Sequence, residues 1–392
     1  MVSIPTETLS GVDPQTAREL FDLPDDVTFL NCANIGPQMR SVTEAGMSAV
    51  AMKAHPWRIS SDTWFSAPEE LRKLAAQLLN VEAEGMALVP AASYGIAVAA
   101  ANVKVKEGQS IVLLDREFPS NFYSWKELAR LRAGRLVIVK CESGESWTDA
   151  LLRAIDENTA VVSIPNCHWS DGGFVDLISV SEKVRQVGAA LVVDASQSLG
   201  VCPLDLGRVR PDFLVSVGYK WLLGPYGLSY LYVAPPWREH GRPIEESWLT
   251  RLGCEDFTKL VDYSDQYRPG ARRFDMGEFP QFVLVPMAAA ALRQMLLWDV
   301  ATIQQSLSVL VDRIAQKAIA AGYSVLPADQ RSNHLIGVRL PQGIPPGLST
   351  ALAAEKVYVS LRGDAIRIAP HVYNDSSDVD RLFEVLNAYL NR

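Results

Sequence analysis

The sequence predicts an α/β fold built on a largely parallel sheet. Seven short apolar runs follow one another after residue 85, and amphipathic stretches long enough for helices separate the first five. Strands that alternate with helices favour parallel pairing, with helices on both faces of the sheet. The seven runs are residues 86–89, 111–114, 136–139, 161–164, 191–193, 213–217 and 228–233.

The length of the chain bears on the number of domains, and its net charge bears on which partners it can bind. At 392 residues the chain is longer than one hydrophobic core usually supports, so we expect two domains. A net charge of −8 argues against nucleic acid or an anionic membrane as a partner. No stretch of about 18 apolar residues is present, and the first residues lack the pattern of a secretory signal. We therefore expect no membrane span and a cytoplasmic location.

The cysteines predict free thiols. Their number is odd, and none has CxxC or Cys/His spacing, which disfavours both a disulfide framework and a metal site. We therefore expect no metal in the functional site. The five residues are Cys32, Cys141, Cys167, Cys202 and Cys254.

Two neighbouring predicted strands lead into polar residues that cannot stay unpaired in an apolar surrounding. Asp194 ends the run 191–193, and Lys220 follows the run 213–217. Parallel strands place their carboxyl ends at one edge of the sheet, where open α/β folds bind ligands. An acid and an amine at this edge fit two interpretations: an ordinary ion pair, or a site for pyridoxal phosphate.

In the second interpretation each residue has a defined task. Lys220 would form a Schiff base with the cofactor, which requires that burial and nearby positive charge lower the pKa of its amine. Asp194 would hold a proton on the pyridine nitrogen, so that the ring can accept electrons from the substrate. Gln197, three residues further on, could reach the phenolic oxygen of the ring.

The segments VVDASQ and SVGYKWLLGPYG resemble the class V aminotransferases, a group of fold-type I pyridoxal-phosphate enzymes that includes cysteine desulfurases, kynureninases and isopenicillin N epimerase-like proteins. Further similarity extends from about residue 29 to residue 374. The resemblance implies an N-terminal arm (1–28), a large cofactor-binding domain with a seven-stranded sheet (29–280) and a small α+β domain (281–392). It also implies a homodimer with the active site at the subunit interface, and a small amino acid as substrate.

The N-terminal half contributes three candidate site residues. After a short helix expected over residues 14–21, the segment TFLNCANIGPQ resembles the family's first strand and turn and makes Asn34 a candidate for substrate contact. The segment alone also fits a plain strand followed by a Gly-Pro turn. Further on, PAASYG predicts a turn into a helix whose first N–H groups would bind the phosphate. The family's two phosphate-cradling positions match Ala92 and Ser93, although an isolated Ser93 would be a structural helix cap.

Aromatic residues are expected around the cofactor. Phe118 matches the family position whose ring stacks on the pyridine, and packing of a helix onto the sheet is the alternative role. Trp169 stands where many desulfurases carry Asn, which indicates a more enclosed pocket. The adjacent His168 is a candidate general acid, but a lone His beside a turn is more often simply hydrogen-bonded. Tyr219, directly before Lys220, matches kynureninases, and its hydroxyl would donate to the phosphate.

An irregular passage follows the last sheet strand. Residues 235–270 lack clean periodicity, and we expect them to shape a substrate mouth or a subunit interface. By resemblance, Gly277 and Glu278 would reach the cofactor phosphate of the neighbouring subunit. Glu278 replaces the Thr of desulfurases. Since a carboxylate repels phosphate, we expect Glu278 to order the loop or to pair with Arg272 or Arg273.

The C-terminal part predicts an α+β arrangement after a long apolar helix over residues 282–298. The segment IRIAPHVYND resembles a family signature in which Arg367 clamps the substrate α-carboxylate through a bidentate pair. Without the signature, an exposed strand residue would be the interpretation. Arg362 offers a second cation for an anion. Strands are expected at 324–326, 334–340, 357–361 and 365–369, and helices at 346–356 and 377–390.

The choice of reaction stays open. The loop VYVSLRGDA has no cysteine, which disfavours a desulfurase or selenocysteine lyase, although Cys254 is an open alternative. What remains is chemistry at the α-carbon of an amino acid: transamination, epimerisation, or β-elimination of the kynureninase or C–S lyase kind. A scaffold that binds without turnover is the alternative from another class. It is disfavoured because four chemically matched residues are retained together: Asp194, Gln197, Lys220 and Arg367.

Overall fold

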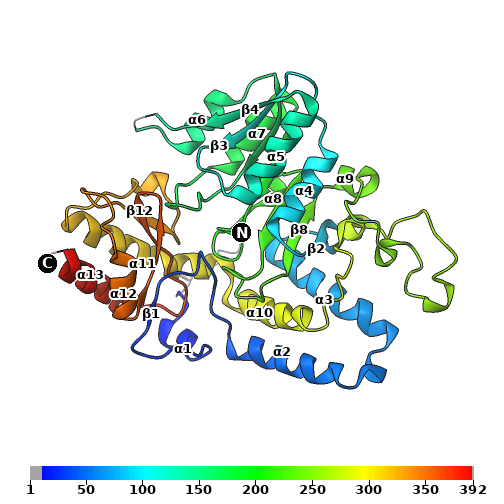
Figure 1. Cartoon of the computed structure of the whole chain (residues 1–392), viewed down its shortest axis with the longest axis horizontal. Helices are drawn as coiled ribbons and strands as arrows, with labels where there is room; N and C mark the ends of the chain where they lie inside the picture. The colour runs from blue at the N-terminus through cyan, green and yellow to red at the C-terminus, as the bar shows by residue number, and fades with distance from the viewer. Residues whose placement is uncertain (1–10, 143, 391–392) are drawn as a thin grey trace, which may run out of the picture.

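The computed structural model describes residues 11–142 and 144–390, and a seven-stranded sheet forms its centre (Figure 1). The strand order is β2-β8-β7-β6-β5-β3-β4. Strand β8 pairs antiparallel with β2 and β7, and all other neighbours are parallel. All seven predicted runs lie in this sheet, so the predicted α/β fold is confirmed. The strands are β2 (Met86–Val89), β3 (Ser110–Leu114), β4 (Arg135–Val139), β5 (Thr159–Ile164), β6 (Ala190–Asp194), β7 (Phe213–Val217) and β8 (Ser229–Val233).

Helices cover both faces of the sheet, which explains why its strands are apolar throughout. Val192 and Val215 belong to the core beneath α4 and α5, whereas their chain neighbours Val193 and Leu214 belong to the core beneath α3, α6, α7 and α10. The sheet is therefore buried on both sides. The helices are α3 (Ser61–Leu79), α4 (Ala92–Asn102), α5 (Pro119–Arg132), α6 (Trp147–Ala154), α7 (Leu177–Val187) and α10 (Leu284–Trp298).

Residues 300–390, here called the C-terminal region, build a second core around a three-stranded antiparallel sheet of order β11-β12-β9 (golden yellow to red in Figure 1). Its elements are α11 (Val300–Ala320), β9 (Ile336–Val338), α12 (Leu348–Ala354), β10 (Val357–Tyr358), β11 (Ser360–Arg362), β12 (Ala365–Ile368) and α13 (Ser376–Leu390). The predicted strand over 324–326 is wrong. Only Ser324 makes a β-bridge, to Arg339, and Pro327 has no N–H with which a ladder could continue.

The N-terminal segment joins the C-terminal region. Strand β1 (Thr28–Phe29) pairs in parallel with β10, and Asn31 forms a β-bridge with Ala369, just beyond β12. The backbone N–H of Cys32 donates to the Ala369 carbonyl over 3.1 Å. The chain therefore passes from this second core directly toward the main sheet. The remaining α-helices are α1 (Pro14–Arg18), α2 (Arg40–Lys53), α8 (Leu206–Val209) and α9 (Pro235–His240).

Helices α10 and α11 meet at a sharp bend. Asp299 separates them with a positive φ of 63°, and its carboxylate accepts from the N–H of Thr302 over 3.1 Å, which caps α11. Within the described residues, no single helix is long and apolar enough to cross a membrane. Only α10 and α11 taken together reach that length and composition, and they are bent by 76°.

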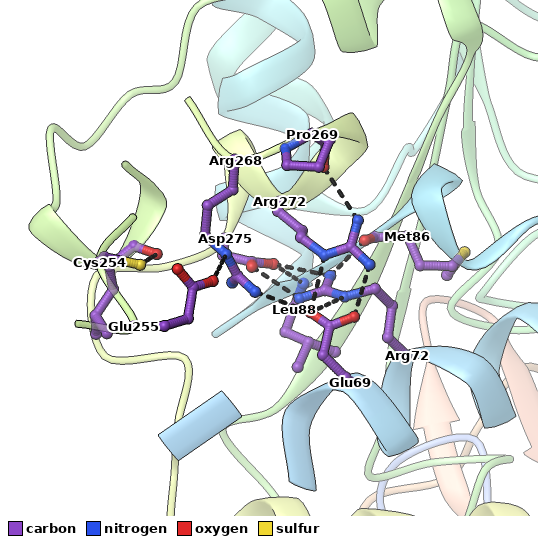
Figure 2. A network of polar contacts seen from close by, with 11 residues as sticks. Glu69, Arg72, Met86, Leu88, Cys254, Glu255, Arg268, Pro269, Arg272 and Asp275 are labelled. Atoms are coloured by element: carbon purple, nitrogen blue, oxygen red, sulfur yellow. Dashed lines mark hydrogen bonds and ion pairs between the residues drawn. The ribbon is translucent and has the colours of Figure 1, made fainter. Parts of the chain in front are cut away.

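The irregular passage between α9 and α10 is fastened to the main sheet by buried charges (Figure 2). Arg72 of α3 pairs with Asp275 over 2.8 Å, and the same carboxylate accepts from the N–H of Leu88 in β2 over 2.7 Å. Glu69, one turn before Arg72, accepts from Arg272 over 2.6 and 2.8 Å. Both members of the Arg72–Asp275 pair are fully buried, so each depends on the other for its charge balance.

Candidate active site

A cavity of about 240 Å³ lies at the carboxyl ends of the sheet strands. Eight of the ten predicted cofactor-binding residues line it: Ala92, Ser93, Phe118, Trp169, Asp194, Gln197, Tyr219 and Lys220. Among its other lining residues are Glu117, Cys167, Ser196 and Tyr226, to which the sequence analysis gave no role. The structure thus gathers residues that are up to 128 positions apart in the chain, from Ala92 to Lys220, around one space.

Lys220 follows β7 and is buried in the cavity wall. Burial, opposed by Asp194 and aided by the charges of Arg367 and Arg362, lowers the pKa of its amine from 10.5 to about 8. The Nζ atom lies 5.3 Å from the centre of the Phe118 ring. A buried amine with a lowered pKa is partly neutral near neutral pH, which is the form that reacts with an aldehyde.

Asp194 and Lys220 share the cavity without making an ion pair within 4.0 Å, in the part of the chain that the structure describes. This separation disfavours the ordinary ion pair that the sequence left open. Asp194 is the last residue of β6, and one of its oxygens accepts from the N–H of Ser196 over 3.0 Å. The arrangement leaves room for a group between the acid and the amine.

Gln197 has a fixed side chain. Its Oε1 accepts from the indole N–H of Trp221 over 2.8 Å, and its Nε2 donates to the Ala33 carbonyl over 3.1 Å. An amide nitrogen carries two N–H groups, so one donor remains. Because Gln197 lines the cavity, this donor is available to a ligand there.

The amino end of α4 faces the same cavity. Ala91, Ala92 and Ser93 line it, and the N-cap residue Ala91 makes no side-chain capping bond. The first N–H groups of a helix have no acceptor within the helix, and its dipole favours anions. This end of α4 is therefore suited to a phosphate.

Two aromatic rings meet at the cavity. Phe118 and Trp169 contact each other edge to face, with ring centroids 5.5 Å apart. The indole N–H of Trp169 donates to the Arg116 carbonyl over 2.7 Å, which holds the ring in place. On the other side, the ring of Tyr219 contacts that of Tyr226 at 4.5 Å.

Glu117 is a buried acid that the sequence analysis missed. Its Oε1 accepts from the N–H of Phe118 over 2.7 Å, and its Oε2 has no partner among the described residues. Burial raises the pKa of Glu117 to about 8, and the nearby charge of Asp194 adds to this rise, whereas His168 opposes it. An acidic residue just beyond a strand of the sheet was the available signal, in the motif that identified Phe118.

His168 is not among the residues that line the cavity. Its ring stacks on Trp147 at 5.3 Å and is hydrogen-bonded to Ser170 over 2.8 Å and to the Asp115 carbonyl over 3.1 Å. These contacts favour the hydrogen-bonded structural role over that of a general acid.

Arg367 lies beneath Trp169, with 1% of its surface exposed. It donates to the Trp169 carbonyl over 2.9 Å and to Ser360 over 3.4 Å, and its Nε has no partner among the described residues. Burial lowers the pKa of Arg367 to about 9, with a further contribution from Arg362, so the group is still charged at neutral pH. Arg362 donates to Oδ1 of Asn34 over 3.2 Å. Arg362 is therefore a neighbour of both predicted substrate-binding residues, Asn34 and Arg367, and neither of these two is among the residues that line the cavity.

Gly277 and Glu278 do not line this cavity. The N–H of Gly277 donates to Glu245 over 2.5 Å. The expected pairing of Glu278 with Arg272 or Arg273 is wrong, because Arg272 is taken by Glu69 and Arg273 donates to backbone carbonyls of residues 239 and 241.

Thiol and metal chemistry find little support in the geometry. Cys167 lines the cavity, but burial raises the pKa of its thiol to about 12, so it is not a thiolate at neutral pH. Cys254 is buried in the irregular passage and donates to the Leu249 carbonyl over 3.4 Å. Across residues 11–142 and 144–390, no cluster of three or more His, Cys, Asp or Glu side chains could hold a metal ion.

The cavity fits pyridoxal phosphate. It offers an amine for the aldehyde, an acid for the ring nitrogen, an amide donor for the phenolic oxygen and an anion-binding helix end for the phosphate. Among the described residues, Oε2 of Glu117 has no partner, and Asp194 and Lys220 form no ion pair with each other, so the cavity wall is not satisfied by the protein alone.

Known proteins are similar over most of the chain. The family model Aminotransferase class-V matches residues 60–382. An uncharacterized aminotransferase of Bacillus subtilis, YcbU, is 25% identical over 390 residues, covering 96% of this chain and 98% of that protein. Isopenicillin N epimerase of Streptomyces clavuligerus is 24% identical over 432 residues, covering 97% and 99%. In fold, the chain resembles an apo cysteine desulfurase from Thermococcus onnurineus, with a TM-score of 0.84, 19% identity and 100% of both chains covered.

These matches agree with the resemblance drawn from VVDASQ and SVGYKWLLGPYG, and with the fold-type I architecture of the sheet. The family match extends from α3 to α13 and so includes both the cavity and the C-terminal arginines. The chain belongs to the class V aminotransferase family, and it is an enzyme that uses pyridoxal phosphate.

Proposed function

We propose that the enzyme acts at the α-carbon of a small amino acid, by transamination or by related lyase or epimerase chemistry. The observation that carries this proposal is the pair Asp194 and Lys220, which face one cavity without neutralising each other. When bound, pyridoxal phosphate withdraws electrons from the α-carbon and so makes its bonds labile. The residues of the chain then decide which bond is broken.

We assign the cofactor contacts as follows. Lys220 holds the aldehyde carbon, Asp194 keeps a proton at the ring nitrogen, and the free N–H of Gln197 binds the phenolic oxygen. Phe118 covers the ring face and Trp169 closes the cavity against water. The phosphate contacts come from the start of α4 at Ala92 and Ser93, from Tyr219, and from the backbone at Gly277 of a neighbouring subunit, in a loop that Glu278 orders.

We assign substrate binding mainly to residues of the C-terminal region. Arg367 has no carboxylate partner among the described residues, and its guanidinium is suited to a bidentate pair with the α-carboxylate. Asn34 borders this position through its contact with Arg362. The Lys220 amine, with its pKa near 8, is the base that takes the α-proton at Nζ.

The wider arrangement of the protein is also part of the proposal. We expect a homodimer in which the loop around Gly277 completes the neighbour's site, with residues 29–280 as the large domain and 281–392 as the small one. The second core, built mainly by the C-terminal region, supports two domains, although α10 packs in the core of the main sheet. All five cysteines are free, which fits a cytoplasmic location.

A second candidate is β-elimination of the kynureninase or C–S lyase kind, because the cofactor contacts are the same for both chemistries. The structure gives less support to a desulfurase. Its only cavity-lining thiol in the described chain, Cys167, is protonated at neutral pH, and the thiol of Cys254 is buried with a pKa raised to about 11. Cys254→Ala should therefore keep full turnover.

The test of the function has two stages. Borohydride treatment of the holoenzyme followed by peptide mass spectrometry should find the cofactor on Lys220. Lys220→Ala should lose the label, whereas the exposed Lys126→Ala should keep it. A panel of amino acids then separates the reactions: a ketoacid indicates transamination, ammonia indicates elimination, and inversion without either indicates epimerisation. A protein that takes up no cofactor would instead be a scaffold without turnover.

A further inference from the structure

Two arginines project from the same face of one hairpin. In the β11–β12 pair, Ser360 stands opposite Arg367 and Arg362 stands opposite Ala365. Residues two apart on a strand share a face, and so do residues directly opposite each other. Arg362 and Arg367 are therefore diagonal neighbours on one side of the hairpin, the side on which Trp169 lies.

Neither guanidinium has an acidic partner among the described residues. Arg367 donates only to the Trp169 carbonyl and Ser360, and Arg362 only to the Leu361 carbonyl and Asn34. The carboxylate of the hairpin turn, Asp364, is engaged by two other arginines: Arg339 at 3.3 Å and Arg116 at 3.7 Å.

Two other buried or half-buried arginines, Arg72 and Arg339, do have carboxylate partners. Arg72 pairs with Asp275 at 2.8 Å, and Arg339 pairs with Asp171 at 2.6 Å. Two neighbouring cations without counter-charge repel each other, and burial adds a desolvation cost. Such an arrangement is stabilised when anions bind to it.

The two cations occupy different depths. Arg367 is almost completely buried below Trp169, whereas Arg362 is half-buried and lies 5.9 Å from the face of the Trp169 ring. Asn34 accepts from Arg362 and holds it on the outer side. The α-carboxylate is attached to the reacting carbon and so belongs to the inner cation. The outer cation then faces a group further along the substrate side chain.

We propose that the substrate is an amino acid whose side chain ends in a second carboxylate, with Arg367 binding the α-carboxylate and Arg362 the distal one. This inference rests on the proposed function, since it names the substrate class of the same site. It gives Arg362 the role of a specificity-determining residue and Asn34 that of its positioning residue.

The first test measures binding without turnover. Calorimetric titration of the holoenzyme with aliphatic dicarboxylates and with monocarboxylates of matching chain length should show tighter binding of the dicarboxylates. Arg362→Gln should weaken dicarboxylate binding by about tenfold or more and leave monocarboxylate binding within about twofold. Equal losses for both classes would overturn the proposal, since they would mean that both arginines hold one carboxylate.

The second test uses kinetics. For aspartate or glutamate as substrate, Arg362→Gln should raise KM by a larger factor than it changes kcat, and Arg362→Lys should restore part of the affinity. For alanine, Arg362→Gln should raise KM by a much smaller factor than it does for aspartate or glutamate. Arg116→Gln is the matched control, because its side chain is exposed and its only ion pair within the described residues is with Asp364.

Failure of this inference is separable from failure of the proposed function. An enzyme that carries its cofactor on Lys220 and prefers neutral amino acids would keep the function and reject the distal carboxylate site. A protein without cofactor on Lys220 would reject both.

Discussion

The indole N–H of Trp221 donates to Oε1 of Gln197 over 2.8 Å, and so the residue next to Lys220 orients an amide that lines the cavity. A second contact reinforces this one: the His334 ring meets Trp221 edge to face at 4.9 Å and is hydrogen-bonded to the Gln197 carbonyl over 2.5 Å. With Oε1 occupied, the amide cannot turn its oxygen toward the cavity.

Trp221→Phe should remove the hydrogen bond that orients the Gln197 amide. The buried Oε1 of Gln197 would lose its donor, at a cost of about 1–3 kcal/mol in the free energy of unfolding. The amide could then rotate, and cofactor affinity should fall. Urea unfolding and titration of the apo-enzyme with pyridoxal phosphate measure the two effects. The exposed Trp57→Phe is the control, and equal behaviour of the two variants would contradict the assignment.

The lowered pKa of Lys220 predicts a pH dependence for cofactor uptake. Only the neutral amine attacks the aldehyde, and its fraction rises with pH until the pKa of about 8 is passed. The rate of reconstitution of the apo-enzyme should therefore rise about tenfold per pH unit well below pH 8 and level off above it. Arg362→Gln should move the midpoint upward, because one of the cations that lower this pKa is removed. A midpoint near 10.5 would show that the amine is not perturbed.

Glu117 predicts a pH dependence of stability. Its pKa is raised from 4.5 to about 8 in the folded protein. Between these two pH values the Glu117 carboxyl is ionised in the unfolded chain but neutral in the folded protein. The free energy of unfolding therefore falls as pH rises. Below pH 4.5 the carboxyl is neutral in both states and contributes no such loss. The free energy of unfolding of Glu117→Gln, relative to that of the parent, should therefore rise by about 1.4 kcal/mol for each pH unit across this window.

Urea unfolding of the apo-protein at a series of pH values checks this expectation for Glu117. Glu44→Gln, at an exposed helix position, serves as the matched control and should run parallel to the parent. Parallel curves for Glu117→Gln as well would mean that this carboxyl is ionised in the folded protein.

The buried pair that fastens the irregular passage predicts a large effect on stability. Arg72→Leu leaves the Asp275 carboxylate buried without its partner and should lower the free energy of unfolding by about 3–5 kcal/mol. Adding Asp275→Asn should recover part of this loss, because the amide is neutral and still accepts from the N–H of Leu88. Chemical denaturation measures both. The exposed Arg130→Ala should cause no measurable change, and a similar loss there would contradict the argument.

The main sheet could be predicted from the sequence because its strands are buried on both faces and are therefore apolar without interruption. The two ends of the site, Asp194 and Lys220, followed from strands of that kind. The first and last residues of the strands in the C-terminal region were harder to predict. They are short, and the run at 324–326 stops at Pro327 for lack of a backbone donor.

Contacts between distant segments could not be predicted. The pairing of Arg272 with Glu69 spans 203 positions, and nothing local to Glu278 indicates that its expected partner is taken. The role of Trp221 depends in the same way on a fold that brings it to Gln197. The sequence shows Glu117 as an acidic residue just after a strand, but its burial, which makes it a candidate site residue, depends on the fold.

Residues 31–36 are tied at one end to Ala369, two positions beyond Arg367, and at the other to Tyr219, whose carbonyl accepts from the N–H of Gly36 over 2.9 Å. A side chain on Gly36 would clash with the Lys220 carbonyl, so this contact is close. The run of six residues is a tether between the anion end and the amine end of the site. Because both ends of the tether are hydrogen-bonded, any displacement of the C-terminal region relative to the main sheet would have to be absorbed within these six residues, beside Lys220.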